Sequence, residues 1–297
     1  MKNRLKPAVV LCGLIWMATT VMAQAQVATD SADAPTWKPS LIAKVSGSQV
    51  GFQNWAEGGV NTFSLNLGVD GKLERVSGVF SQTHELRLGY GIVKQETLDL
   101  RKSEDIIRLA MTFEYTGGGF FGKLNPTFAI LARSQFDEGF AFQKNPFGDE
   151  RTPPVKVSDL LSPGTFQQSI GLTHSPGNWF KQRLGIAAKE TVVLIEELRP
   201  LYSVDPDKNA RFELGLESFT KVDKEVFEHV HYKSTLGLFA AFNKLQKPDF
   251  LWENLVAMKV NDWLSVNFEW VVLYDTDISS KAQFKEVFSI GVSYILI

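Results

Sequence analysis

The stretch FSLNLGVDGKLE, residues 63–74, alternates between apolar and polar side chains almost without interruption. Its apolar members are every second residue, namely Phe63, Leu65, Leu67, Val69 and Leu73. A period of two places the apolar and polar sets on opposite faces of a β-strand. The fold therefore depends on what the apolar face contacts, which is either a protein core or lipid.

The same alternation recurs along the chain to its last residues and predicts twelve strands. A helical period competes with it only briefly, near Val193–Leu198. The chain is therefore predicted to be all-β. The expected strands lie at 40–52, 60–75, 79–93, 105–116, 121–136, 165–174, 179–192, 210–222, 226–242, 249–260, 263–275 and 283–296.

The connections between these strands alternate in length. Every second connection is a tight turn, at 76–78, 117–119, 175–178, 223–225 and 261–262, and the others are longer, up to loop 137–164. Short periplasmic turns, longer extracellular loops and an even strand number are typical of outer-membrane barrels. The pattern predicts a transmembrane antiparallel up-and-down β-barrel of about 12 strands, with both termini on the periplasmic side.

Aromatic residues gather at both ends of the expected strands, as they do at the two interfaces of a bilayer. At the short-turn end they are Phe80, Phe113, Tyr115, Phe120, Trp179, Phe180, Phe227, Trp263 and Tyr294. At the long-loop end they are Tyr90, Phe136, Phe166, Phe242, Phe250, Trp252, Tyr274 and Phe284. A soluble β-sandwich also alternates, but it predicts neither two aromatic belts nor alternating loop lengths. The apolar face is therefore expected to contact lipid.

The first residues predict export. Residues 1–25 combine a basic start, an apolar run and small-x-small cleavage positions, which is the pattern of a cleaved signal peptide. Residues 26–36 would then form a short periplasmic segment, too short for a plug domain, and residues 37–297 the barrel. The only cysteine, Cys12, lies in the apolar run, so the mature chain would contain no disulfide. It would carry 28 Lys and Arg against 33 Asp and Glu, which argues against a nucleic-acid partner.

Several short motifs also resemble a known family, and their order and spacing carry the resemblance. They are Asn54-Trp55, Gly58-Gly59, Leu88-Gly89-Tyr90-Gly91, Arg101-Lys102-Ser103-Glu104-Asp105, Leu161-Ser162-Pro163, Met258-Lys259-Val260-Asn261, Leu273-Tyr274-Asp275-Thr276-Asp277 and Gln283-Phe284-Lys285-Glu286. From about Trp37 to its end, the chain resembles the family named domain of unknown function 3078, found in Bacteroidota and related bacteria. The resemblance implies an outer-membrane barrel of a Gram-negative envelope and implies no activity.

The partners expected of such a barrel are outer-membrane lipid, lipopolysaccharide and, during biogenesis, the barrel-assembly machinery. Barrels of this kind tend to end in Phe, as a signal to that machinery. This chain departs from the pattern, because it ends Tyr294-Ile295-Leu296-Ile297.

The four histidines are candidates for catalytic or metal-binding residues. His84 falls on the lipid side and would suit a lipid hydrolase only with a serine nearby. His174 and Ser175 are adjacent in a turn, so their side chains diverge, and His229 and His231 share a face but have no recognisable third metal ligand. No catalytic, cofactor-binding or metal-binding residue is assigned.

The lumen face is more informative, because it carries both signs of charge. Its charged members are Asp70, Lys72, Glu74, Glu85, Arg87, Arg108, Glu114, Lys123, Arg133, Lys181, Arg183, Lys189, Arg211, Glu213, Glu217, Lys233, Glu253, Lys259, Glu269 and Lys285. Unpaired charges are costly in such a site. The sequence therefore predicts a lumen crossed by ion pairs, which leaves a narrow or closed path.

These features favour a narrow passive channel for small solutes. Loop 137–164 is then an ordered cap over the mouth, a segment that folds inward, or a solvated and variable surface loop. The first alternative is a non-conducting barrel that holds an envelope protein or glycan through loops 94–104, 137–164 and 193–209. The second is a lipid-modifying membrane enzyme built around His84.

Overall fold

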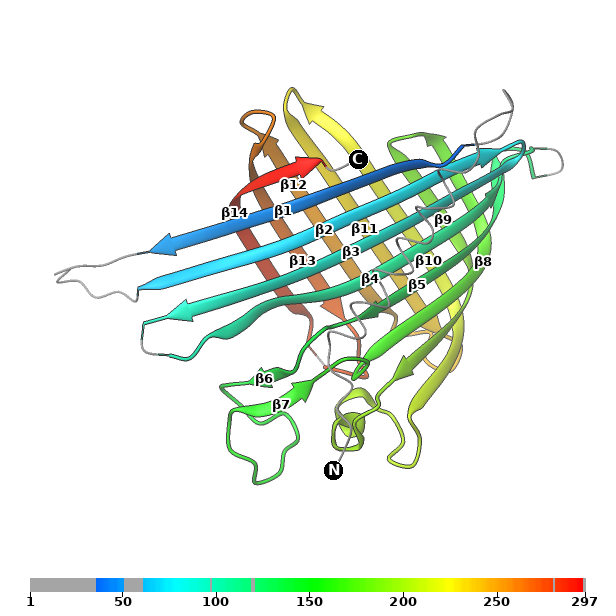
Figure 1. Cartoon of the computed structure of the whole chain (residues 1–297). Coiled ribbons are helices and arrows are strands. Elements are labelled where there is room, and N and C mark those ends of the chain that lie inside the picture. The colour runs from blue at the N-terminus through cyan, green and yellow to red at the C-terminus, as the bar shows by residue number, and fades with distance from the viewer. Residues whose placement is uncertain (1–35, 51–60, 97, 119–120, 280, 296–297) are drawn as a thin grey trace.

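The computed structural model describes residues 36–50, 61–96, 98–118, 121–279 and 281–295, and within them twelve strands close into one antiparallel barrel (Figure 1). Their bounds are β1 Lys38–Val50, β2 Thr62–Ser77, β3 Phe80–Gln95, β4 Arg101–Tyr115, β5 Leu124–Ser134, β8 Gly164–Gly177, β9 Phe180–Val192, β10 Ala210–Phe227, β11 Val230–Ala241, β12 Asp249–Lys259, β13 Leu264–Tyr274 and β14 Gln283–Ile295. Each strand pairs with the next one of this series, and β1 closes the barrel on β14. All twelve predicted strands are confirmed.

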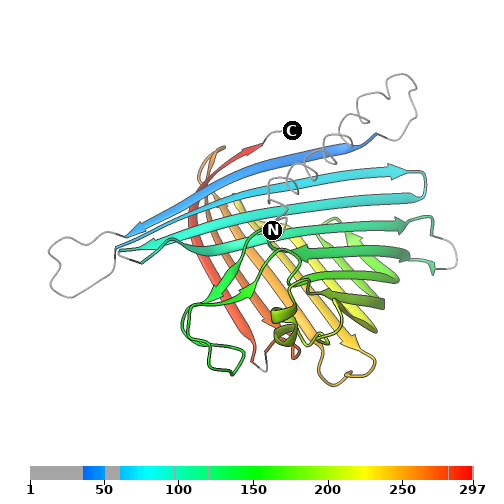
Figure 2. The same ribbon diagram turned by 60° about the horizontal axis from the view of Figure 1, so that its bottom comes forward.

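Three further elements lie in the long connections. Strands β6 (Gly139–Ala141) and β7 (Val155–Ser158) form a separate two-stranded sheet between β5 and β8. A 3-10 helix, η2 (Glu196–Tyr202), lies between β9 and β10, where the sequence has its brief helical period. These elements gather at one end of the barrel (Figures 1 and 2). The short turns, the start of β1 and the end of β14 lie at the other end, which is the periplasmic end of such barrels.

The predicted turn at 223–225 is wrong, because β10 continues to Phe227 and the chain turns at Glu228 and His229. The strand continues because its pairing with β11 runs on through Asp223 and Glu225, and the Asp223 carboxylate lies 2.5 Å from the His231 ring. The turn predicted at 175–178 is also too early, since β8 runs to Gly177. Strand β4 begins at Arg101 rather than at 105, with a bulge in its pairing to β3.

The outer face of the barrel carries the apolar half of the alternation. In residues 63–74, Phe63 and Leu67 are 47% and 50% exposed. At the short-turn end Phe80, Phe227 and Trp263 are exposed, and at the long-loop end Phe284 is. An apolar outer surface with aromatic residues at both ends is that of an outer-membrane barrel. The side chains of Phe120 and Tyr294 lie outside the part of the structure that is described.

Several predictions fall on residues that the structure does not describe. These are the signal peptide at 1–25, the segment up to residue 35 and the family motifs at residues 54–59. Among the described helices, none has the length and apolar character needed to cross a bilayer.

Candidate functional site

A cavity of about 810 Å³ occupies the lumen of the barrel. Near the periplasmic end it is lined by Lys72 and Glu85, and near the extracellular end by Gln135 and Asp275. Polar and charged side chains from most strands of the barrel contribute to it, because the inward half of the alternation is polar. The lumen is therefore the main candidate for a functional site.

Three arginines stand side by side on one wall of the lumen. Arg87 on β3 is directly opposite Arg108 on β4, and Arg108 is directly opposite Arg133 on β5. We call these three residues the arginine row. Like charges directly opposite each other on neighbouring strands destabilise a sheet. The row therefore needs compensation from elsewhere in the lumen.

The facing wall supplies two carboxylates. Arg108 donates a hydrogen bond to Glu253 of β12 at 2.5 Å, and Arg87 donates one to Glu269 of β13 at 2.8 Å. Strands β4 and β12 are six strands apart in either direction around the barrel, so the Arg108–Glu253 pair spans the full width of the lumen. Both side chains are mostly buried, at 16% and 12% exposure. The predicted lumen crossed by ion pairs is confirmed.

Further ion pairs follow toward the periplasm. Lys221 of β10 binds Glu85 of β3 at 2.6 Å, and Lys181 of β9 binds Glu114 of β4 at 3.3 Å. Lys221 was absent from the charged lumen residues predicted from the sequence. The signal was available, because Lys221 continues the odd-numbered series of Arg211, Glu213 and Glu217 on the same strand. Two residues that were predicted, Lys123 and Lys259, lie at the barrel ends and are exposed.

The extracellular mouth has its own charged cluster. Lys189 reaches Asp249 at 2.7 Å and Asp275 at 3.0 Å. Asp277, in the connection that follows β13, pairs with Arg211 and with Lys244, the latter at 2.5 Å. Burial alone would raise the pKa of the Asp277 carboxyl, but the hydrogen bond from Lys244 and the charge of Arg211 outweigh burial and lower it.

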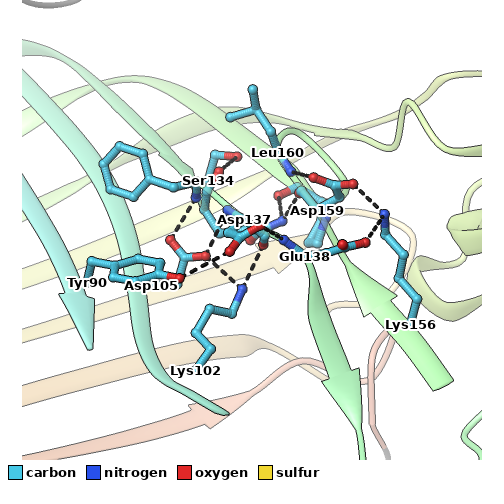
Figure 3. A network of polar contacts seen from close by, with 12 residues as sticks. Tyr90, Lys102, Asp105, Ser134, Asp137, Glu138, Lys156, Asp159 and Leu160 are labelled. Carbon is cyan, nitrogen blue, oxygen red and sulfur yellow. Dashed lines mark hydrogen bonds and ion pairs between the residues drawn. The ribbon is translucent and has the colours of Figure 1, made fainter. Parts of the chain in front are cut away.

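Loop 137–164 is anchored to the rim of the barrel by one carboxylate (Figure 3). The Asp105 side chain of β4 accepts hydrogen bonds from the backbone N–H groups of Phe136 at 2.7 Å and Asp137 at 3.0 Å. Lys102 donates to Asp105 and to the Asp137 carbonyl, each at 2.7 Å, and the Tyr90 hydroxyl donates to the Asp137 carboxylate at 3.1 Å. The bulge in β4 re-aims side chains near Ser103, as bulges do, and this end of the strand carries the anchor.

A small hydrophobic core joins this loop to loop 193–209. Val193, Leu198, Tyr202 and Val204 form the core, and Phe147 packs against it. The Tyr202 hydroxyl donates a hydrogen bond to the Val157 carbonyl at 2.7 Å, and burial raises the pKa of Tyr202 to about 12. We call the two packed loops the cap. Loop 137–164 is ordered, because it carries a sheet, an anchor and part of a core, and its role as a cap over the mouth stays a prediction.

The cap also holds a buried hydroxyl. The side chain of Ser162 is inaccessible to solvent, and its Oγ accepts hydrogen bonds from the backbone N–H groups of Leu194 at 3.0 Å and Ile195 at 3.1 Å. This contact fastens the end of loop 137–164 to the start of loop 193–209. In the sequence, Ser162 stands out only as part of the family motif Leu161-Ser162-Pro163.

The four histidines lie in different surroundings. His84 lies on the outer face between Trp37 and Phe113, with ring centroids 5.4 and 5.6 Å away. His174 Nδ1 lies 3.5 Å from the carbonyl of Lys123 rather than near a serine hydroxyl. His231 contacts Asp223, while His229 lies in the turn with a positive φ of 64°. Within the described residues no group of three or more His, Cys, Asp or Glu side chains is arranged to hold a metal.

Comparison with known proteins supports the family resemblance. Residues 48–140 match the model of the family described as Protein of unknown function (DUF3078). This match confirms the resemblance over these residues, and the resemblance of the remainder of the chain stays a prediction. No curated protein is detectably similar in sequence.

Two bacterial outer-membrane proteins are among the solved structures that align with this chain. The translocator domain of the autotransporter NalP from Neisseria meningitidis aligns with a TM-score of 0.37 and 8% identity, covering 96% of this chain and 97% of that one. An outer-membrane channel from Pseudomonas putida F1 aligns with a TM-score of 0.38 and 9% identity, covering 90% of this chain and 98% of that one. The membrane location of the present chain follows from its own closed barrel and apolar outer face.

Proposed function

We propose that this barrel is a narrow passive channel for small solutes in the outer membrane, with selectivity set by the charges of its lumen. Outer-membrane lipid and lipopolysaccharide would cover its apolar outer face, and the barrel-assembly machinery would insert it. The observation that carries the channel proposal is the lumen cavity of about 810 Å³, whose lining runs from Lys72 and Glu85 at one end to Gln135 and Asp275 at the other.

The Arg108–Glu253 pair would then be the constriction of the channel. It crosses the lumen at its full width, so solutes pass beside it rather than through it. Charged side chains that line a pore set which ions enter it. The cap would narrow the extracellular mouth, because Gln135, just before its long loop, and Pro163, near the end of that loop, also line the cavity.

The test is single-channel current across a planar bilayer that contains the purified protein. The intact protein is expected to give small steps. The double variant Arg108→Ser/Glu253→Ser removes the crossing pair without changing the net charge, and it should give larger steps. The matched control is Lys72→Ser/Glu74→Ser, which also removes a neutral lumen pair, at 2.7 Å, but one that lies along β2 and does not cross the lumen.

A second variant tests the cap. Replacing residues 144–152 with two glycines removes the tip of the long loop and keeps β6 and β7. Larger steps in this variant would make the cap a partial lid, and unchanged steps would limit it to a surface role. Absence of current in the intact protein, in the crossing-pair variant and in the cap variant together would contradict the channel proposal.

The cap also favours a second candidate, which is a non-conducting barrel that docks an envelope protein or glycan. Its support is that the cap is ordered and exposes Phe140 and Phe142, with the Arg101 guanidinium stacked 4.0 Å over the Phe142 ring. Photo-crosslinking from position 140 in the native membrane tests this role. A specific crosslink that disappears in the Arg101→Ser variant, with no current in the bilayer, would favour docking over conduction.

A further inference from the structure

We infer that Arg133, together with Thr165 on the neighbouring strand, binds a small oxyanion, either a carboxylate or a phosphate, on its way through the lumen. This inference rests on the proposed channel function, because it names the class of solute that the channel would select. It starts from the balance of charges around the arginine row.

Among the described side chains in the middle of the lumen, one cation has no carboxylate partner. Arg87 binds Glu269 and also lies 3.8 Å from Glu104, Arg108 binds Glu253, and Lys285 lies 3.9 Å from Glu104. Arg133 makes no hydrogen bond or ion pair with any residue that the structure describes. It stands directly opposite Arg108, so the surplus charge lies beside a like charge.

This arrangement is costly unless something else compensates it. A side chain that repels its cross-strand neighbour and forms no ion pair destabilises the wall that holds it. Arg133 lines the lumen cavity, and its guanidinium nitrogens are not among the buried atoms that lack a partner, so they face the space of the cavity. A mobile anion that enters the cavity can therefore reach the guanidinium and compensate its charge.

The neighbouring strand adds further polar groups to the same place. Thr165 of β8 is directly opposite Arg133, and Gln167 follows two residues later on the same face. Both line the cavity. In the described part of the chain, neither side chain has a hydrogen-bond partner. The hydroxyl of Thr165 and the amide of Gln167 are thus available as hydrogen-bond donors beside a guanidinium.

These donors specify the chemistry of the ligand. The guanidinium is a planar fork that binds two oxygens of one carboxylate or phosphate at once. A hydroxyl donor next to the fork suits a third oxygen or the second face of the anion. The ligand must also be small, because the Arg108–Glu253 pair spans the lumen next to the site.

Isothermal titration calorimetry of the purified protein in detergent, at constant ionic strength, tests the site without requiring conduction. The probes are sodium phosphate and sodium acetate in separate titrations, and the better binder identifies the oxyanion class. We expect saturable binding of at least one probe to the intact protein. Arg133→Gln should weaken it by roughly tenfold or more, the effect of losing hydrogen bonds from a charged donor.

The control is Lys181→Gln, which removes one lumen cation that also lines the cavity but lies on β9 beside Glu114. It should leave the affinity within about a factor of two, since Glu114 compensates the charge of Lys181 and salt in the buffer screens it. Arg133→Gln breaks no ion pair of the described residues, so it should fold as well as the intact protein, which heat-modifiable gel mobility verifies. If both variants weaken binding equally, the anion responds only to total lumen charge and the site is refuted.

The same preparations in the bilayer separate the two proposals. Binding that depends on Arg133 without any current supports the oxyanion site and refutes the channel. Current without binding of either probe supports the channel and refutes the site. Current that phosphate or acetate reduces in the intact protein, and not in Arg133→Gln, supports both.

Discussion

The outer and inner surfaces of the barrel wall are built from alternate residues of the same strands, yet they follow different rules. On β10, Phe212 and Leu216 point outward and are 64% and 49% exposed. Glu213 and Glu217, one residue further along the chain in each case, point inward and are 8% and 6% exposed. Adjacent residues thus lie in lipid and in a charged lumen.

This difference shows what each surface requires of the sequence. An outward side chain gains free energy from any apolar neighbour, so its class matters more than its identity. An inward charge loses its hydration and regains that free energy only from a particular partner, as Glu217 does from Arg183 at 2.7 Å. The effect of an outer-surface substitution on the free energy of unfolding should therefore depend on its depth in the bilayer. The effect of an inner-surface substitution should depend on the partner that it leaves unpaired.

The largest effect is expected from removing one member of the crossing pair. Glu253→Leu leaves the mostly buried Arg108 without the partner of its ion pair. Loss of one partner of a buried ion pair costs about 3 to 5 kcal/mol. The free energy of unfolding, measured with urea in lipid vesicles, should fall by about that amount.

The double variant Arg108→Leu/Glu253→Leu is the control for this prediction. It removes both charges, so most of the lost free energy of unfolding should return. If the double variant is as unstable as Glu253→Leu alone, the cost comes from lost packing in the lumen and not from an uncompensated charge.

A smaller effect is expected from a charge on the outer surface, and it should depend on depth. Leu216 and Phe212 share the lipid face of β10, but Phe212 lies near the extracellular end of the strand. An arginine costs about 2 to 4 kcal/mol at the middle of the bilayer and about 0 to 1 kcal/mol near its interface. Leu216→Arg should therefore lower the free energy of unfolding in vesicles by more than Phe212→Arg does. Equal losses would place this part of β10 outside the apolar band.

The outer surface could be predicted from the sequence because its rule is a pattern of residue classes. The alternation at residues 63–74, the short turns and the aromatic ends were enough to give twelve strands and their inward and outward faces. The errors lie at the strand ends. The run Asp223-Lys224-Glu225 predicts a turn, whereas the partner of Asp223 on the next strand, His231, is visible only once the register is known.

The inner surface and the cap could be predicted only in kind. The sequence shows that both signs of charge face the lumen, but it does not show that Arg108 and Glu253 meet, because these residues are 145 positions apart and their contact depends on barrel closure. The surplus charge at Arg133 is likewise invisible until the register places it opposite Arg108. In the cap, Tyr202 and Ser162 lie in predicted loops and outside every periodic stretch of the sequence, so no pattern predicts their burial.

The smallest expected effect on stability is in the cap, where a small apolar core holds two loops together. Burial raises the pKa of Tyr202 to about 12, above the value of about 10 in an unfolded loop. The folded cap therefore keeps the Tyr202 hydroxyl protonated, while the hydroxyl ionises in an opened cap. The stability that Tyr202 contributes is thus complete below pH of about 10 and is lost as pH rises toward 12.

Limited proteolysis with an alkaline protease should cut near Val157 faster at pH 11 than at pH 8. Tyr202→Phe lacks the hydrogen bond to the Val157 carbonyl, which is worth about 1 kcal/mol, so the variant should be cut somewhat faster than the intact protein at pH 8. Its cleavage rate should rise less between pH 8 and pH 11, because phenylalanine does not ionise. The same rise with pH in both proteins would show that another group opens the cap, and cleavage within the strands would show that the barrel itself has loosened.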